Sequence, residues 1–229
     1  MRVHRYREVA ALNQGVAEAL VARAAGSQRA LRLCLSDGLG DACAAASDIG
    51  GAKLRHLDLW WSNDCFVDVT DPARVSTRTL AALGAARLAA SHIHPMPTPS
   101  GNPDVDAAAI AYAAELGETS FDLAVLVVRD DGGVAGLTPG AGAFTQPSPH
   151  TVMGVRDVHG ECLTLTLDTL ARSDDVWLIA EGEAVAAVLP RILEGDETLP
   201  AGALRGRQNT QLFIDEPAAA QLPRHSCEL

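Results

Sequence analysis

The residues with the clearest chemical potential follow an apolar run from Leu123 to Val128. A continuous apolar run that ends in a glycine-rich turn is typical of a buried parallel strand. Open α/β sheets place their ligand sites at the carboxyl ends of such strands. The turn here, Asp130-Asp131-Gly132-Gly133, offers two carboxylates and two glycines, but no nucleophile, histidine or lysine. The position of the turn therefore predicts an active site, but the turn lacks the nucleophilic and basic side chains that catalysis usually requires.

A second turn of this kind follows the short apolar stretch 31–35. It reads Ser36-Asp37-Gly38-Leu39-Gly40-Asp41 and leads into an alanine-rich segment of helical character. A strand, a glycine-rich turn and a helix form the usual cradle for a phosphate, which binds the N–H groups at the helix N-terminus. Carboxylates can occupy the same N–H groups. We favour an Asp-capped turn over a phosphate site.

Thiols and carboxylates mark a third region. Asn63-Asp64-Cys65 follows the expected strand 54–61, and His159 and Cys162 precede the expected strand 163–167. The side chains of Asp64, Cys65, Asp131, His159 and Cys162 would suit zinc if the fold brought them together. Cysteines that merely fill space are the favoured interpretation, because no ligand-spacing motif is present. We predict neither a metal nor another cofactor.

Strands and helices alternate along the whole chain, which indicates an α/β fold. We expect a single Rossmann-like domain over residues 1–229, with a mostly parallel sheet flanked by helices. The expected helices cover 8–25, 42–46, 77–90, 104–116, 184–193 and 216–222. The expected strands cover 31–35, 54–61, 123–128, 151–155, 163–167, 176–180 and 212–214.

Composition narrows the possible partners. The 229 residues carry a net charge of −11. Nucleic acids and anionic membranes need a basic surface, so neither is expected as a partner. No apolar run approaches the ~20 residues needed to span a bilayer, and the first residues lack the apolar core of a signal peptide. Five irregularly spaced cysteines do not indicate a disulfide framework. We expect a cytoplasmic protein.

Several short segments, in order, give the chain a family resemblance. They include Asp71-Pro72-Ala73-Arg74, His94-Pro95-Met96-Pro97, Leu137-Thr138-Pro139-Gly140 and Leu163-Thr164-Leu165-Thr166. With these pieces the chain resembles actinobacterial 6-phosphogluconolactonases, which are relatives of glucosamine-6-phosphate isomerase. The resemblance covers nearly the whole length. It implies the lactonase fold and hydrolysis of 6-phospho-D-glucono-1,5-lactone in the oxidative pentose phosphate pathway.

The motifs that carry the family's chemistry are altered. The resemblance implies a histidine general base where this chain has Gly133, after Asp131-Gly132. It implies a phosphate-binding Gly-Gly-Ser-Thr turn at positions 37–40 and an Asp-Glu-Arg motif at 63–65. The other substituted positions are Val75 beside the retained Arg74, Cys162 in place of an arginine, and Val185 in place of a lysine.

Two functions follow from the resemblance. A working lactonase would need Asp131, Asp64 or His159 as its base, because general base catalysis needs a titratable group near the attacking water. It would bind a sugar phosphate or another small molecule in the altered pocket. A pseudoenzyme would keep the fold and act as a binding or regulatory subunit, with a partner such as a pentose-phosphate enzyme. We prefer the pseudoenzyme.

Overall fold

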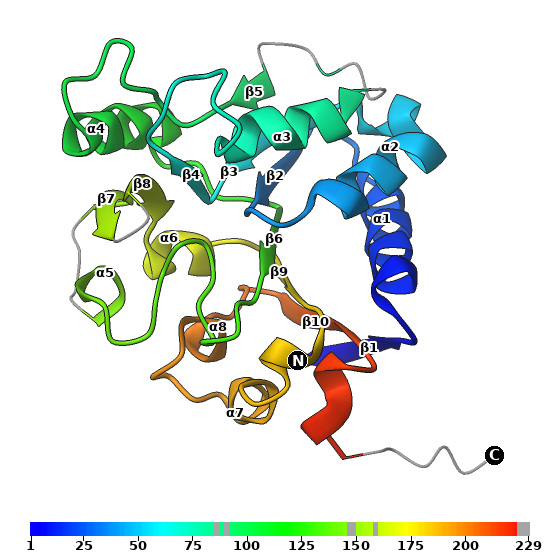
Figure 1. The fold of residues 1–229 in the computed structure, drawn as a ribbon. Coiled ribbons are helices and arrows are strands. Elements are labelled where there is room, and N and C mark those ends of the chain that lie inside the picture. The colour runs from blue at the N-terminus through cyan, green and yellow to red at the C-terminus, as the bar shows by residue number, and fades with distance from the viewer. Residues whose placement is uncertain (85–87, 89–91, 146–149, 158–159, 224–229) are drawn as a thin grey trace.

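The architecture is an α/β fold built on one large parallel sheet, as the sequence predicts (Figure 1). A computed structural model describes residues 1–84, 88, 92–145, 150–157 and 160–223. The sheet has seven strands in the order β1-β10-β9-β6-β2-β3-β5, and all neighbouring strands run parallel. The strands are β1 Arg2–Tyr6, β2 Leu31–Leu35, β3 Leu57–Trp61, β5 Ile93–His94, β6 Leu123–Val127, β9 Asp175–Ala180 and β10 Asn209–Asp215.

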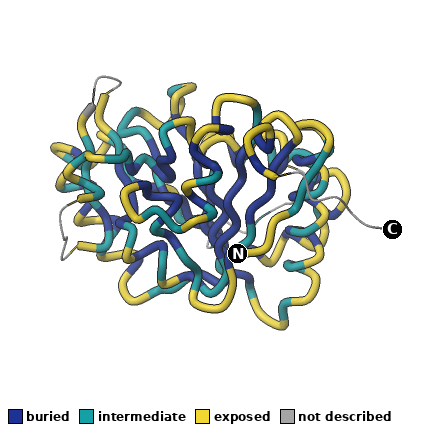
Figure 2. Tube along the Cα trace, turned by 90° about the horizontal axis from the view of Figure 1, so that it is seen from below, coloured by how far each residue is buried: buried dark blue, intermediate teal, exposed yellow. Residues whose placement is uncertain are grey.

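Helices cover both faces of this sheet. In Figure 1, α1 and α2 lie against each other on one face, and α6, α7 and α8 lie on the opposite side. Burial on both faces explains why β2, β6 and β9 are almost continuously apolar, and Figure 2 shows the buried strands through the middle of the molecule. The helices are α1 Val9–Ala25, α2 Gly40–Leu54, α3 Val75–Ala82, α4 Val105–Leu116, α5 Gly142–Thr145, α6 Leu167–Ala171, α7 Leu189–Glu194, α8 Pro200–Ala203 and the 3₁₀ helices η3 Glu183–Val185 and η4 Ala218–Gln221.

A second, antiparallel sheet was not predicted. Its strands are β4 Asn63–Cys65, β8 Gly160–Leu165 and β7 Val152–Asp157, in the order β4-β8-β7. The expected strand 163–167 therefore begins earlier, at Gly160, and residues 63–65, expected only to follow a strand, form one themselves. A three-residue strand such as β4 carries too little periodicity to be recognised, and its pairing with β8 exists only in the folded chain.

Several expected elements differ in their bounds: the helix 42–46 is part of the longer α2, and the helix 216–222 is reduced to the 3₁₀ helix η4. The strand predicted from residue 54 begins at Leu57, because Leu54 still belongs to α2. The predicted helix 184–193 is divided into η3 and α7, and Pro190 stands in the first turn of α7. Proline fits the first turn of a helix but not its interior, which accounts for the break. Part of the expected helix 77–90 lies outside the described residues.

The strand order places a topological switch point between β2 and β6. The chain leaves β2 for β3 on one side, and it leaves β6 for β9 on the other. The loops after these two adjacent strands therefore diverge, and ligands of open α/β sheets bind in the resulting crevice. Both turns singled out in the sequence lie at this point. Among the described residues, no helix is long and apolar enough to cross a membrane.

A buried tyrosine stabilises the outer edge of the sheet, where β3 pairs with the short strand β5. Pairing of β5 with β3 ends at Trp60, one residue before Trp61. The Tyr112 hydroxyl of α4 accepts the Trp61 N–H at 3.2 Å and donates to the His94 carbonyl at 3.0 Å. It therefore supplies hydrogen bonds that a longer β5 would have made.

We expect Tyr112→Phe to lower the free energy of unfolding by about 1–3 kcal/mol, because a buried backbone N–H loses its partner. Denaturant unfolding followed by tryptophan fluorescence measures the change. Tyr6→Phe, at a partly exposed tyrosine, is the matched control and should change stability by less than about 0.5 kcal/mol. Equal effects in the two variants would contradict a role for the Tyr112 hydroxyl.

Candidate functional site

The loop after β2 forms one wall of a shallow cavity. A space of about 210 Å³ is lined by residues 37–41 together with Arg78 and Thr79 of α3. The Asp37 carboxylate accepts the Gly38 N–H at 2.8 Å and the Arg78 guanidinium at 2.5 Å. Asp37 therefore occupies both an N–H group and the cation that a bound phosphate would use.

The expected Asp-capped turn is present at the Gly38 N–H, but no aspartate caps α2 itself. The helix begins at Gly40, and its N-cap Leu39 makes no side-chain capping bond. The N-terminus of α2 thus faces the cavity, but with Asp41 in its first turn. A carboxylate at this end satisfies the helix dipole and competes with any other anion for it.

Further acidic groups surround this helix end. Burial, reinforced by the charges of Asp215 and Asp41, raises the pKa of the Glu181 carboxyl at the end of β9. Of the described residues that line the cavity, Arg78 alone carries a positive charge. The local field therefore disfavours a phosphate, as the global charge does.

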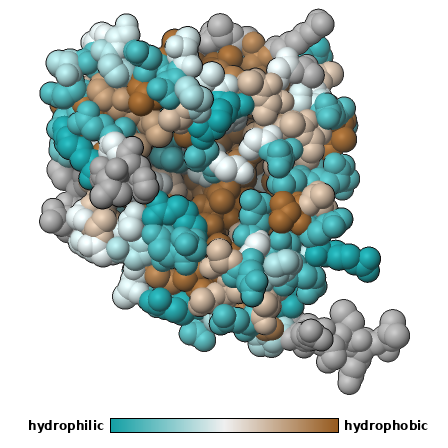
Figure 3. All heavy atoms as spheres, in the orientation of Figure 1, coloured by the Kyte–Doolittle hydropathy of each residue, from teal (hydrophilic) through white to brown (hydrophobic). Residues whose placement is uncertain are grey.

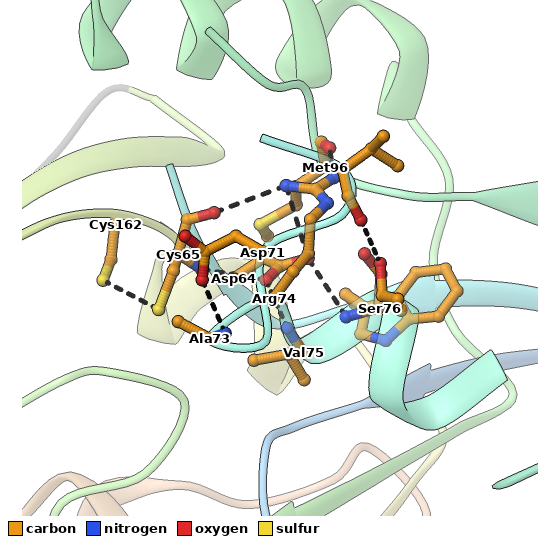
Figure 4. A network of polar contacts seen from close by, with 12 residues as sticks. Asp64, Cys65, Asp71, Ala73, Arg74, Val75, Ser76, Met96 and Cys162 are labelled. Atoms are coloured by element: carbon orange, nitrogen blue, oxygen red, sulfur yellow. Dashed lines mark hydrogen bonds and ion pairs between the residues drawn. The ribbon is translucent and has the colours of Figure 1, made fainter. Parts of the chain in front are cut away.

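Asp64 and Arg74 lie in the interior of the protein, where they contact each other (Figure 4). The Asp64 carboxylate accepts the N–H groups of Cys65 at 2.9 Å, Val75 at 2.7 Å and Ser76 at 3.2 Å. Its Oδ2 is 3.7 Å from the Arg74 guanidinium, which also donates to the carbonyls of Cys65 and Met96. The side chains of Asp64 and Arg74 are only 0% and 1% exposed.

Asp64 thus caps α3 from a distant strand, which explains why this helix begins at Val75 rather than after Ser76. A carboxylate that accepts three N–H groups and is 0% exposed is not accessible to a substrate water in this structure. The two terminal nitrogens of the Arg74 guanidinium likewise donate to carbonyls inside the protein, whereas its buried Nε has no hydrogen-bond partner among the described residues. Both residues serve the fold in this structure.

Charged side chains of the turn after β6 bind each other and thereby hold the turn together. The Arg129 guanidinium donates to the Asp131 carboxylate at 2.5 Å and to the Thr138 hydroxyl at 2.8 Å. The Gly133 N–H donates to the same carboxylate at 2.7 Å. Partial burial opposes ionisation, but these hydrogen bonds and the Arg129 charge together lower the pKa of Asp131. A carboxylate with a lowered pKa is a weak general base at neutral pH.

The position of the expected base has no space for a side chain. A Cβ atom added to Gly133 would lie 2.5 Å from the Leu137 carbonyl oxygen and 2.8 Å from the Asp131 carboxylate. The Leu137 N–H and the Val134 carbonyl form a 2.8 Å hydrogen bond that holds this part of the loop closed. The loop has adapted to glycine, so a histidine would require a different backbone.

Two cysteines face each other next to the cavity. The sulfur atoms of Cys65 and Cys162 are 3.8 Å apart on the paired strands β4 and β8. Arg78 and Asp37 are close enough to act on the Cys65 thiol electrostatically. Among the described residues no group of three or more histidines, cysteines or carboxylates could hold a metal ion, and Asp64 points into the N-terminus of α3 instead.

Three of the predicted residues remain. Asn63 is in β4, where its side chain accepts the Ser62 hydroxyl at 3.1 Å. Val185 is buried in η3, and His159 lies outside the described residues. Figure 3 shows apolar residues at the centre of the face, where Figure 1 draws the ends of β6 and β9.

Sequence reasoning missed two arginines of the site. Arg78 stands four residues after Arg74 on α3, and Arg129 stands two residues before Asp131. Each is paired with a carboxylate of a predicted turn. The spacing of Arg129 and Asp131 is a local signal that could have been noticed, whereas the contact between Arg78 and Asp37 joins residues 41 positions apart.

Comparison with known proteins decides the ancestry. The sequence model of the family described as glucosamine-6-phosphate isomerases/6-phosphogluconolactonase matches residues 7–213. The chain belongs to this family. It is 34% identical to the 6-phosphogluconolactonase of Streptomyces coelicolor over 82% of this chain and 78% of that protein. It is 30% identical to the enzyme of the same name from Mycobacterium tuberculosis, over 94% of both chains.

Solved structures of the family share the fold. The 6-phosphogluconolactonase of Trypanosoma brucei superposes with a TM-score of 0.79 at 20% identity and covers 97% of this chain and 98% of its own. A monomeric glucosamine-6-phosphate deaminase superposes with a TM-score of 0.80 at 17% identity, over 96% of this chain and 100% of its own. At these identities the likeness shows the fold alone.

The crowding at Gly133 leads to a prediction about stability. We expect Gly133→Ala to lower the free energy of unfolding by about 1–3 kcal/mol, because its Cβ would collide with backbone that is held in place. Gly40→Ala is the matched control from the same face, since a Cβ there meets no atom within 4 Å. It should be neutral or stabilising by up to about 1 kcal/mol. Chemical denaturation of both variants measures the difference, and an undisturbed Gly133→Ala would show that the loop has room.

Proposed function

We propose that this protein is a family member without lactonase catalysis, and that it acts as a binding or regulatory subunit. The observation that carries the proposal is the engagement of Asp64 and Asp131, the two described carboxylates that the sequence offered as replacements for the missing base. Asp64 caps α3 inside the protein, and Asp131 is held by Arg129 and the Gly133 N–H. The Asp64 carboxylate is buried among its donors and the pKa of Asp131 is lowered, whereas a base for lactone hydrolysis must be free to take a proton from the attacking water.

The substrate-binding side of the site supports the same proposal. A phosphorylated sugar needs cations that are free to bind it. Arg74 is buried against Asp64, and Arg78 is paired with Asp37. The surrounding acidic groups would repel a phosphate ester. The partner of such a protein is then a less anionic small molecule or another protein, and the resemblance suggests a pentose-phosphate enzyme.

The direct test is hydrolysis of freshly prepared 6-phosphogluconolactone. We expect no turnover above the spontaneous rate, while the Mycobacterium tuberculosis relative serves as the positive control. Loss of a general base alone typically costs about 10²–10⁴ in rate. Gly133→His should not restore activity, because the loop cannot take the side chain without rearrangement. Turnover by the wild-type protein near the rate of the relative would overturn the proposal.

A variant that gains affinity for a phosphate ester tests whether Asp37 keeps such ligands out of the cavity. We expect Asp37→Ser to bind 6-phosphogluconate at least about tenfold more tightly than the wild-type protein, because it frees both Arg78 and the Gly38 N–H for a phosphate. Titration calorimetry measures the dissociation constants. Asp130→Ser is the control, since it removes the same charge from an exposed residue of the neighbouring turn. Equal affinities of the two variants would show that Asp37 does not keep the anion out.

A further inference from the structure

The facing cysteines of the small sheet have the geometry of a disulfide that has not yet formed. Cys65 of β4 pairs directly with Cys162 of β8. One position further along, the Phe66 N–H bonds to the Glu161 carbonyl at 2.8 Å. Hydrogen-bonded and non-hydrogen-bonded pairs alternate in an antiparallel ladder. Cys65 and Cys162 therefore form a non-hydrogen-bonded pair, in which opposite side chains approach each other most closely.

The arrangement of the two side chains is already close to the one that a disulfide bond requires. Figure 4 shows the two side chains directed at each other, with their sulfur atoms 3.8 Å apart. A disulfide needs a sulfur separation of about 2.05 Å and Cα atoms about 4.4–6.8 Å apart. Non-hydrogen-bonded pairs have Cα atoms about 4.5 Å apart. Small side-chain rotations can therefore form the bond without a change of register.

The pKa of Cys65 is shifted in the opposite direction from those of Cys34 and Cys43. The hydrogen bond donated by Cys162, helped by the Arg78 charge, lowers the pKa of Cys65 to about 7, against opposing effects of burial, Asp64 and Asp37. Burial raises the pKa of Cys43 to about 12, and it also raises that of Cys34. Cys65 and Cys162 are only partly buried. A large thiolate fraction and an accessible sulfur are what redox-active cysteines require.

We propose that Cys65 and Cys162 form a reversible dithiol–disulfide pair that hydroperoxides oxidise. The Cys65 thiolate attacks an oxygen of hydrogen peroxide, and the O–O bond breaks to give a sulfenic acid and hydroxide, which takes up a proton. The Cys162 sulfur then attacks the Cys65 sulfur and releases a second water. In sum, two thiols and one hydrogen peroxide become one disulfide and two waters. A dithiol reductant reverses the reaction.

The bond would link β4 to β8 across 97 positions of the sequence. It would also withdraw the Cys65 thiolate from the surroundings of Asp37 and Arg78, which line the cavity. The pair stands where the resemblance implies two arginines. Thiol chemistry at these positions does not depend on whether lactonase catalysis is present, so its test is independent of the activity assay.

The test is a peptide map of the wild-type protein. The reduced protein is treated with a small excess of hydrogen peroxide, alkylated in denaturant and digested. We expect a Cys65–Cys162 cross-linked peptide, the loss of two alkylatable thiols and their recovery with dithiothreitol. The oxidation rate should rise with pH through about 7, because the thiolate is the reacting form.

Variants separate this chemistry from simple space filling. Cys43→Ala, at a buried cysteine of α2, should still form the cross-link at the wild-type rate. Cys162→Ala should form none, should leave a Cys65 sulfenic acid that dimedone traps, and should move the pH dependence of the rate upward. Two thiols that remain alkylatable after peroxide, or a cross-link to any other cysteine, would overturn the proposal.

Discussion

The buried Asp64 carboxylate is the interaction on which the geometry of the candidate site depends. It joins β4 to the N-terminus of α3 through the N–H groups of Val75 and Ser76, and it balances the buried charge of Arg74. Removal of either charged partner would leave the other uncompensated in a low-dielectric interior, which is strongly destabilising. The position of α3, and with it that of Arg78 at the cavity, therefore depends on a carboxylate that is fully buried among its partners.

The same arrangement recurs across the carboxyl edge of the sheet. Asp64 with Arg74, Asp37 with Arg78 and Asp131 with Arg129 are three pairs in which a carboxylate faces a guanidinium. The first pair is buried, and the other two are partly exposed. A ligand phosphate would have to displace a carboxylate that is already in contact and already attached to the chain. Internal pairing of this kind accounts physically for a site that keeps arginines and still offers little to an anion.

The fold is less sensitive to these changes than the chemistry. A parallel sheet buried on both faces needs only apolar strands. The crevice between β2 and β6 needs only that the chain leave these strands in opposite directions. Solved lactonase and deaminase structures share this frame at 16–20% identity. The frame brings the altered turns to one edge whatever side chains they carry. Function must therefore be argued from the side chains at that edge rather than from the frame.

The sequence by itself determined the family, the mostly parallel sheet and the two turns at its switch point, because apolar runs and glycine-rich turns are local patterns. It also showed that position 133, where the family resemblance implies a histidine base, is a glycine. Only the tertiary structure decided that Asp64 caps α3, that Asp37 binds Arg78, and that Cys65 faces Cys162. Each of these contacts joins residues between 11 and 97 positions apart. No local pattern encodes which distant groups meet, since strand order and register, set by burial of the whole sheet, bring them together.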